Sequence, residues 1–172
     1  LIDDSTFQGC SSLISLKLPD SVEFIGNHAF IDCCSLVEIS IPSLVKSIGN
    51  YAFASCSSLT NFLIPSSVNS IGECCFSDCS SLTEILICSS LSSFPNFVFK
   101  NCEKLKKIEI PASVTTIGNG CFNGCVSLTS IVLPPSIKVL ENKVFCNCIK
   151  LTQIEIPDSI ESIGDNCFEK CK

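Results

Sequence analysis

Cysteine is the residue type through which this chain could most readily do chemistry, because it occurs fifteen times in 172 residues. Three pairs have a spacing that resembles half of a zinc site: Cys75 and Cys79, Cys121 and Cys125, and Cys167 and Cys171. A structural zinc ion needs four convergent ligands, usually from two such elements that meet in space. Here successive pairs lie two sequence repeats apart, and no Cys-x-x-Cys motif occurs. We therefore expect no metal, no cofactor and no thiol redox centre.

The remaining groups offer little for catalysis. The chain has one histidine, His28, and no arginine, and its serines stand in none of the usual nucleophile or phosphate-binding motifs. Glu38 and Glu84 occupy equivalent positions two repeats apart, and if their segments are stacked strands, their separation of roughly 9–10 Å would suit an inverting glycosidase. A flat sheet without a cleft makes that interpretation unfavourable. We expect that the protein is not an enzyme.

Charge and hydropathy exclude further classes of function. The net charge is -6, and the basic cluster of Lys100, Lys104, Lys106 and Lys107 is typical of a solvated patch. Nucleic-acid binding needs a basic surface, so no nucleic-acid partner is expected. No apolar run approaches the ~18–20 residues of a membrane span.

Two residue types recur with a fixed period of 23, which is the signature of a solenoid. The phenylalanines of this ladder are Phe7, Phe30, Phe53, Phe76, Phe99, Phe122, Phe145 and Phe168. A cysteine follows each of them three residues later: Cys10, Cys33, Cys56, Cys79, Cys102, Cys125, Cys148 and Cys171. Each repeat is expected to be one coil that packs only on its neighbours, so stacking makes the fold stable.

The first half of each repeat predicts a short parallel strand. A leucine is followed after three residues by one apolar residue and after five by another, as in Leu36, Ile39 and Ile41. The last two alternate with a period of two, which indicates a strand with one buried face, and a proline then ends most copies. Seven such strands are predicted, with partial repeats at both ends, so residues 1–172 form a single solenoid domain that is expected to be a piece of a longer protein.

The second half predicts a turn and a compact helical element. A pair such as Val22 and Ile25 leads to a glycine, for example Gly26, which suits a turn with positive φ. The Ala/Cys–Phe–x–x–Cys segment is expected to form a helical or 3₁₀ turn, because positions three apart then face the same side.

The ladder cysteines have two interpretations. Equivalent Cα atoms in neighbouring coils would lie ~4.8 Å apart, which is inside the window for disulfides. Pairwise bridges would, however, make the repeats unequal, and a free cysteine fills a small apolar site well. We therefore favour buried thiols.

One region departs from the template. Cys88 replaces the proline, Phe94 and Pro95 replace isoleucine and glycine, and Phe97 adds an aromatic ring; Glu141 later replaces another glycine. Pro95 fixes φ, so a bend or an altered coil is expected there. The segment 88–97 is either a recognition feature or neutral variation in a redundant array, and the second is favoured.

The linked pattern of Leu-x-x-Ile-x-Ile-Pro-x-x-Val-x-x-Ile-Gly-x-x-Ala-Phe-x-x-Cys resembles the BspA-like, or Treponema pallidum-type, leucine-rich repeat over essentially the whole chain. The resemblance implies a right-handed arc of α/β type with a parallel sheet on its concave side. It also implies a cell-surface or secreted protein that adheres to matrix proteins or to other cells.

Outward positions on the strands are where a protein partner would bind. Leu63 and Leu86 would be adjacent, and Val132 would lie two strands further on. The predicted partner-binding residues on the concave face are Glu38, Asn61, Leu63, Glu84, Leu86, Lys107, Glu109 and Val132. The alternative is a featureless sheet, with the binding site elsewhere in the protein.

The function predicted from the sequence is a non-enzymatic module for protein–protein interaction or adhesion. Two alternatives remain: a cytoplasmic scaffold of the same fold, and a structural array in which coils associate end to end. No small-molecule substrate is expected.

Overall fold

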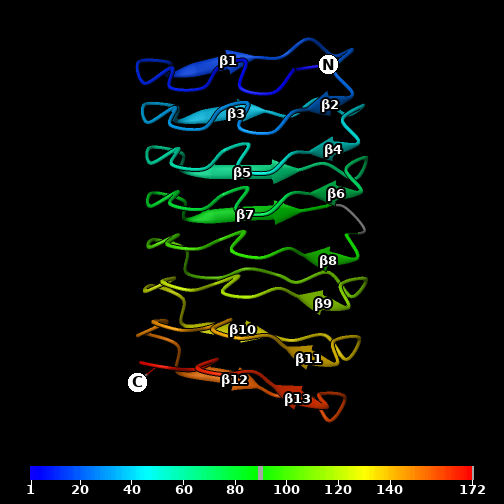
Figure 1. The fold of residues 1–172 in the computed structure, drawn as a ribbon, viewed down its shortest axis with the longest axis vertical. Helices are drawn as coiled ribbons and strands as arrows, with labels where there is room; N and C mark the ends of the chain where they lie inside the picture. The colour runs from blue at the N-terminus through cyan, green and yellow to red at the C-terminus, as the bar shows by residue number, and fades with distance from the viewer. Residues whose placement is uncertain (89–90, 172) are drawn as a thin grey trace.

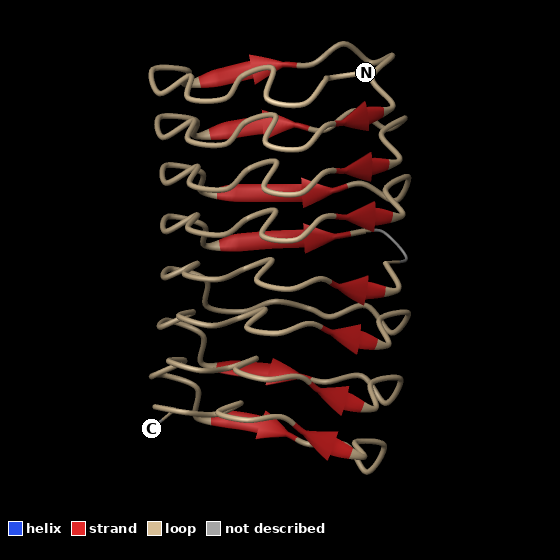
Figure 2. Ribbon diagram, viewed as in Figure 1, coloured by secondary structure: helices blue, strands red, loops and turns tan. Residues whose placement is uncertain are grey.

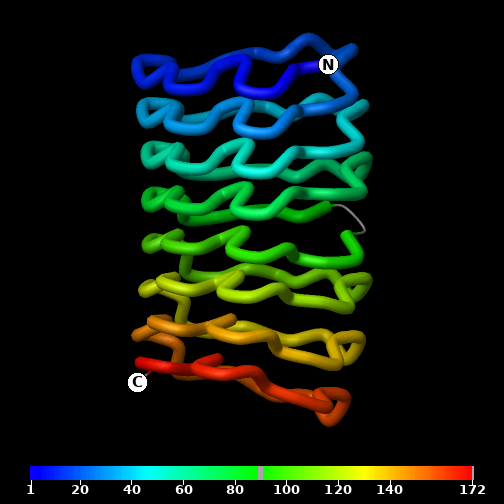
Figure 3. The backbone as a smooth tube through the Cα atoms, viewed as in Figure 1, coloured from blue at the N-terminus to red at the C-terminus, as the bar shows by residue number. Residues whose placement is uncertain are grey.

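The chain winds into a stack of flat coils (Figure 1, Figure 3) in the computed structural model, which describes residues 1–88 and 91–171. Within these residues there are strands and turns and no helix (Figure 2). The solenoid predicted from the 23-residue period is therefore confirmed. Most coils carry one longer strand and one short strand on different sides, joined by turns.

The longer strands form the surface that we call the long-strand face. They are β1 (Ser15–Lys17), β3 (Glu38–Ser40), β5 (Asn61–Ile64), β7 (Glu84–Ile87), β10 (Ser130–Val132) and β12 (Gln153–Glu155). Parallel pairing joins β1 to β3, β5 to β7 and β10 to β12, with residues 23 apart in register, such as Phe62 opposite Ile85. Six of the seven predicted strands are thus present.

The seventh predicted strand is absent. Residues 107–110 follow the path of their neighbours, and Ile108 is buried as predicted. Within the described part of the chain, however, no backbone hydrogen bond joins residues 107–110 to the coil on either side. The inward apolar positions therefore place the side chains, but they do not by themselves bring the backbones into pairing distance.

A second column of strands, the short-strand column, was not predicted. It contains β2 (Phe24–Ile25), β4 (Ser47–Ile48), β6 (Ser70–Ile71), β8 (Ser93–Phe94), β9 (Thr116–Ile117), β11 (Val139–Leu140) and β13 (Ser162–Ile163). These strands pair in parallel in the orders β2-β4-β6 and β8-β9-β11-β13. In β2, β4, β6 and β9 the inward residue is the isoleucine of the Val-x-x-Ile pair, as in Ile48, and Phe94 and Leu140 take its place in β8 and β11. Ile163 of β13 is exposed.

The short-strand column divides between β6 and β8, where Pro95 departs from the template. At equivalent positions the glycine N–H donates to a carbonyl of the preceding coil, as from Gly72 to Ile48 and from Gly118 to Phe94. Pro95 has no N–H to donate. The expected alteration is thus a lost backbone bond. Coil 88–97 otherwise keeps its register, since Phe94 pairs with Ile117; residues 89–90 lie outside the described part.

The ladder phenylalanines form the centre of the core, as the sequence predicted. Phe30, Phe53, Phe76, Phe99, Phe122 and Phe145 are each 0 % exposed. Neighbouring rings stack nearly parallel, with centroids 5.0–5.8 Å apart. Offset stacking of aromatic rings adds to the free energy of their burial.

The predicted helical or 3₁₀ element around each phenylalanine is wrong. The residues two before and two after each phenylalanine have positive φ, for example His28 at 57° and Asp32 at 60°. This left-handed conformation interrupts any helix. Alternate N–H groups then point to the next coil, as from Phe30 to the carbonyl of Ala52. The backbone N–H groups therefore bond alternately to the next coil and, as from Cys33 to Phe30, within the same coil.

These inter-coil bonds are unbroken along the stack. The N–H of every ladder phenylalanine from Phe7 to Phe145 donates to a carbonyl of the following coil, and so do the N–H groups two residues before and two residues after it, all at 2.7–3.0 Å. A left-handed residue costs roughly 1–2 kcal/mol when it is not glycine. Three backbone hydrogen bonds per coil offset that cost. We call this side of the molecule the turn edge.

The expected role of the template glycine is also wrong. Gly26, Gly49, Gly72, Gly118 and Gly164 do not have positive φ. A Cβ atom at Gly26 or Gly49 would instead lie 2.5–2.6 Å from atoms of the preceding coil. Glycine is needed here because two backbones approach each other closely.

Candidate functional site

The cysteine ladder forms a row of buried hydrogen-bond donors. From Cys33 to Cys171, each ladder thiol donates to the carbonyl of the phenylalanine 26 residues earlier, at 3.1–3.2 Å. Cys56, Cys79 and Cys125 are 0 % exposed, like the other inner members, which confirms the buried-thiol interpretation. All fifteen cysteines are unbridged.

Burial also makes these thiols poor nucleophiles. Desolvation raises the pKa of Cys33 to about 11 and that of Cys148 to about 12, and it also raises the pKa of Cys79 and Cys102. The thiolate is the reactive form of cysteine, so a raised pKa suppresses reactivity near neutral pH. In residues 1–88 and 91–171, no group of three or more His, Cys, Asp or Glu side chains is placed to hold a metal ion.

The residues predicted to bind a partner lie on the long-strand face and point outward. Leu63 is 49 %, Leu86 is 53 % and Val132 is 76 % exposed. Glu38, Asn61 and Glu84 stand at the first positions of β3, β5 and β7, so they form one row across the face. Lys107 and Glu109 lie in the unpaired segment 107–110.

Seven of these eight residues surround three successive shallow hollows. The first, of ≈ 200 Å³, is lined by Asn61, Leu63, Glu84 and Leu86 together with inward side chains. The second, of ≈ 630 Å³, is lined by Glu84, Leu86, Lys107 and Glu109, and the third, of ≈ 470 Å³, by Lys107, Glu109 and Val132. The two larger hollows flank the segment that has no strand pairing. Glu38 is separate, because it lines a fourth hollow beside β1.

The chemistry of this surface is mixed. Leucine and valine side chains provide exposed apolar area, and carboxylates and a lysine stand beside them. Contiguous apolar area rimmed by polar groups is characteristic of protein-binding surfaces. Glu38 and Glu84 do not share a hollow, so the structure does not bring the two carboxylates together around one small-molecule site.

The turn edge carries a row of polar side chains that the sequence analysis missed. These residues follow the template glycine or the residue that takes its place. Five carry amides and three carry carboxylates, and we call them the amide ladder: Asp4, Asn27, Asn50, Glu73, Asn96, Asn119, Asn142 and Asp165. Where it is intact, the Oδ1 atom of one member accepts the backbone N–H of the next, as Asn27 does from Asn50 at 2.8 Å. The recurring Gly-Asn pairs could have revealed it.

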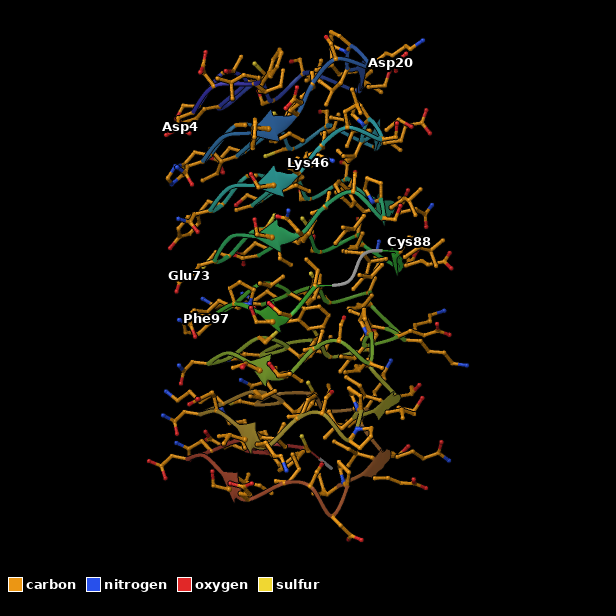
Figure 4. The ribbon with its side chains drawn as sticks, turned by 90° about the vertical axis from the view of Figure 1, so that its right-hand side faces the viewer. Asp4, Asp20, Lys46, Glu73, Cys88 and Phe97 are labelled. Atoms are coloured by element: carbon orange, nitrogen blue, oxygen red, sulfur yellow. The ribbon has the colours of Figure 1, made fainter. Side chains whose placement is uncertain are left out.

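A column of left-handed residues runs beside the amide ladder. In Figure 4, Asp4, Glu73 and Phe97 lie along one edge, and Cys88, which follows β7, lies at the opposite edge. His28 stacks on Tyr51 with ring centroids 5.1 Å apart. This column and the long-strand face are therefore separate surfaces.

No helix among the described residues is long and apolar enough to span a membrane.

Comparison with known proteins places these features in a family. The model of the BspA type leucine rich repeat region matches residues 1–126 and 92–172, which together include the whole chain. A search of curated proteins gave no match.

Three solved structures share the fold. A leucine-rich repeat protein from Eubacterium ventriosum is 28 % identical with a TM-score of 0.84, and the match covers 92 % of this chain and 43 % of that one. The T. pallidum leucine rich repeat protein is 31 % identical over 99 % of this chain and 71 % of its own, with a TM-score of 0.65. A leucine rich cell surface protein from Faecalibacterium prausnitzii is 28 % identical over 98 % and 54 %, with a TM-score of 0.63. The chain thus spans less than half the length of the first of these relatives.

Proposed function

Because the chain belongs to the family of BspA type leucine-rich repeat proteins, we propose that its long-strand face binds a protein partner and that the protein is an adhesion or interaction module at a cell surface. The observation that carries the proposal is the group formed by Leu63, Leu86 and Val132. They are exposed, stand on equivalent sides of their coils and border a continuous series of hollows.

The polar neighbours would provide specificity. Lys107 lines the second hollow together with Glu84 and Glu109 and the third hollow together with Glu109, so the face presents charge of both signs. Complementary charge steers association and fixes register more than it adds affinity. Asn61 adds an amide beside Leu63. Glu38 would contact only a partner that extends over the hollow beside β1.

The location at a cell surface is supported by a relative whose description is that of a cell surface protein. A cytoplasmic scaffold of the same fold is the second candidate, which the unbridged cysteines favour, because thiols stay reduced in the cytosol. Immunolabelling of intact cells that express the natural full-length protein separates the two. Labelling without permeabilisation supports the surface; labelling that requires permeabilisation contradicts it.

The binding face is tested with Leu63→Lys combined with Leu86→Lys. The probes are a panel of immobilised purified extracellular-matrix proteins and the biotinylated surface proteins of cultured epithelial cells. A partner that the unmodified protein captures should lose at least about tenfold in affinity, since charge replaces apolar contact area at the centre of the interface.

Leu44→Lys is the matched control. The exposed fraction of Leu44 is 48 %, which is similar to those of Leu63 and Leu86, but Leu44 lies in the turn between β3 and β4. It should leave binding unchanged. If the face variant folds, as shown by an unchanged urea midpoint, and still binds as tightly as the control, the long-strand face is not the binding surface.

A further inference from the structure

The amide ladder is interrupted at two places, and both follow from the sequence. At all five template glycines, the following residue donates its N–H to the ladder side chain of the preceding coil, at 2.6–2.8 Å. Pro95 and Glu141 replace glycine at the other two junctions, and there no such bond forms within the described residues. A Cβ atom at the glycine position would occupy the space of the accepting oxygen, as at Gly26 and Gly164. A residue larger than glycine at this position therefore prevents the hydrogen bond between successive members of the ladder.

The two interruptions differ in their consequences. Beside Pro95, the longer side chain of Glu73 still reaches the next coil and accepts from Asn96 Nδ2 at 2.8 Å. Beside Glu141, no hydrogen bond among the described residues joins the side chain of Asn119 to Asn142. An acceptor, Asn119 Oδ1, and a donor, Asn142 Nδ2, are thereby available on facing coils.

This open junction lies in a hollow of ≈ 480 Å³ at the turn edge. One wall is Phe97, whose ring leans over Gly120 because that position has no side chain. Lys143 and Asp165 also line the hollow. In Figure 4, Phe97 marks this edge, away from the long-strand face. The volume is within the range of about 300–1,000 Å³ that is typical of small-molecule sites.

We propose that this hollow binds a neutral sugar ring, a hexopyranose unit of a glycan. The charges of Lys143 and Asp165 are opposite, so they favour neither an anion nor a cation. A pyranose carries hydroxyl groups that both donate and accept, which suits Asn119 Oδ1, Asn142 Nδ2 and Asp165 together. Its ring also has an apolar C–H face that can lie on the part of the Phe97 ring that lines the hollow, while Lys100 Nζ, 5.9 Å from the ring centroid, lies outside the hollow. This site is independent of the protein-binding face.

The test uses methyl glycosides of glucose, galactose, mannose and N-acetylglucosamine as probes, measured by saturation-transfer NMR and calorimetry on the whole chain. At least one should bind. Phe97→Leu should weaken that binding by about tenfold or more, because the aromatic surface is lost. Tyr51→Leu is the matched control. Tyr51 is an exposed aromatic residue at the position equivalent to Phe97, two coils earlier in the same column and outside the hollow, so its loss should leave glycoside binding unchanged.

A second variant tests the open junction itself. Glu141→Gly restores the template residue, so the Asn142 N–H can approach Asn119 Oδ1 and the hollow should close. Glycoside binding should then be lost while the urea midpoint is kept. The proposal is overturned if none of the four glycosides binds, or if one binds equally well to Phe97→Leu and Glu141→Gly. Neither result affects the proposal for the long-strand face, which is tested by Leu63 and Leu86.

Discussion

The turn edge and the long-strand face join the coils in different ways. At the turn edge, three backbone hydrogen bonds per coil, the stacked phenylalanines and the thiol bonds continue through every junction from Phe7 to Phe145. On the long-strand face, pairing stops between β3 and β5 and again on both sides of residues 107–110. One side thus holds the stack together, and the other is free to vary in sequence.

This difference predicts which changes affect stability and which affect binding. Perturbations of the turn edge and of the ladders beneath it should unfold the protein. Perturbations of the long-strand face should leave stability nearly unchanged. Four experiments test the contrast, beginning with the largest expected effect.

Alkaline pH should destabilise the fold through the buried thiols. Their folded-state pKa is raised, to about 12 for Cys148, above the value of about 8.5 in an unfolded chain. Their contribution is therefore complete below pH 8.5 and is lost as the pH rises towards the folded-state value. Between these two pKa values, each such thiol lowers the free energy of unfolding by about 1.4 kcal/mol for every unit by which the pH rises.

Several ladder thiols act together, so urea melts in reductant should show a steep fall in stability between pH 8 and pH 10. Cys148→Ala removes one of these thiols, so the free energy of unfolding should fall less steeply with pH, by the contribution of one proton. A urea midpoint that is the same at pH 8 and pH 10 would show that the thiols ionise as readily in the folded state and are not buried.

Phe76→Ala should cost about 3–5 kcal/mol, as a large-to-small change in a packed core. Phe76 is fully buried and stacks on both Phe53 and Phe99. Chemical denaturation measures the loss. A cost below about 1 kcal/mol would mean that the phenylalanine ladder does not hold the coils together.

Gly72→Ala should cost about 1–3 kcal/mol, because the new methyl group meets the backbone nitrogen of Asn50 in the preceding coil. Gly9→Ala is the control, because no atom lies within 4 Å of a Cβ added there. The positive φ of Gly9 makes that substitution strained, so it measures the cost of a glycine-to-alanine change without a close contact. If Gly72→Ala costs no more than Gly9→Ala, close approach of the coils is not the reason for glycine.

Leu63→Lys and Leu86→Lys should each change the free energy of unfolding by no more than about 0.5 kcal/mol, since both side chains are about half exposed. The same urea melts provide the measurement. A loss above about 1.5 kcal/mol would show that the long-strand face supports the fold as the turn edge does, and the contrast would fail.

Much of the fold could be predicted from residue spacing. The period of 23 shows which residues are equivalent, and the recurrence of Phe and Cys identifies the core. The outward direction of Leu63, Leu86 and Val132 also followed, because side chains alternate along a strand. Whether these residues bind a partner stays a prediction.

The turns could not be predicted in the same way. A spacing of three between Phe30 and Cys33 suits a 3₁₀ turn as well as the observed conformation. The left-handed position two residues before each phenylalanine has a weak signal in residue type, since His28 and Asn166 favour it but Tyr51 and Phe97 do not. The position two residues after each phenylalanine has a stronger signal, because most of its residues are of types that favour this conformation, such as Asp32, Gly124 and Asn147.

Residue spacing alone identified the side chains that form the core, because apolar residues that recur at a fixed period are the ones that stacked coils bury. The backbone of the turns, the second column of strands and the hydrogen bonds of the amide ladder became evident only in the three-dimensional structure. The physical reason is that these features depend on hydrogen bonds and close contacts between residues about 23 positions apart. A single repeat contains only one partner of such a contact, so its local pattern cannot specify these features.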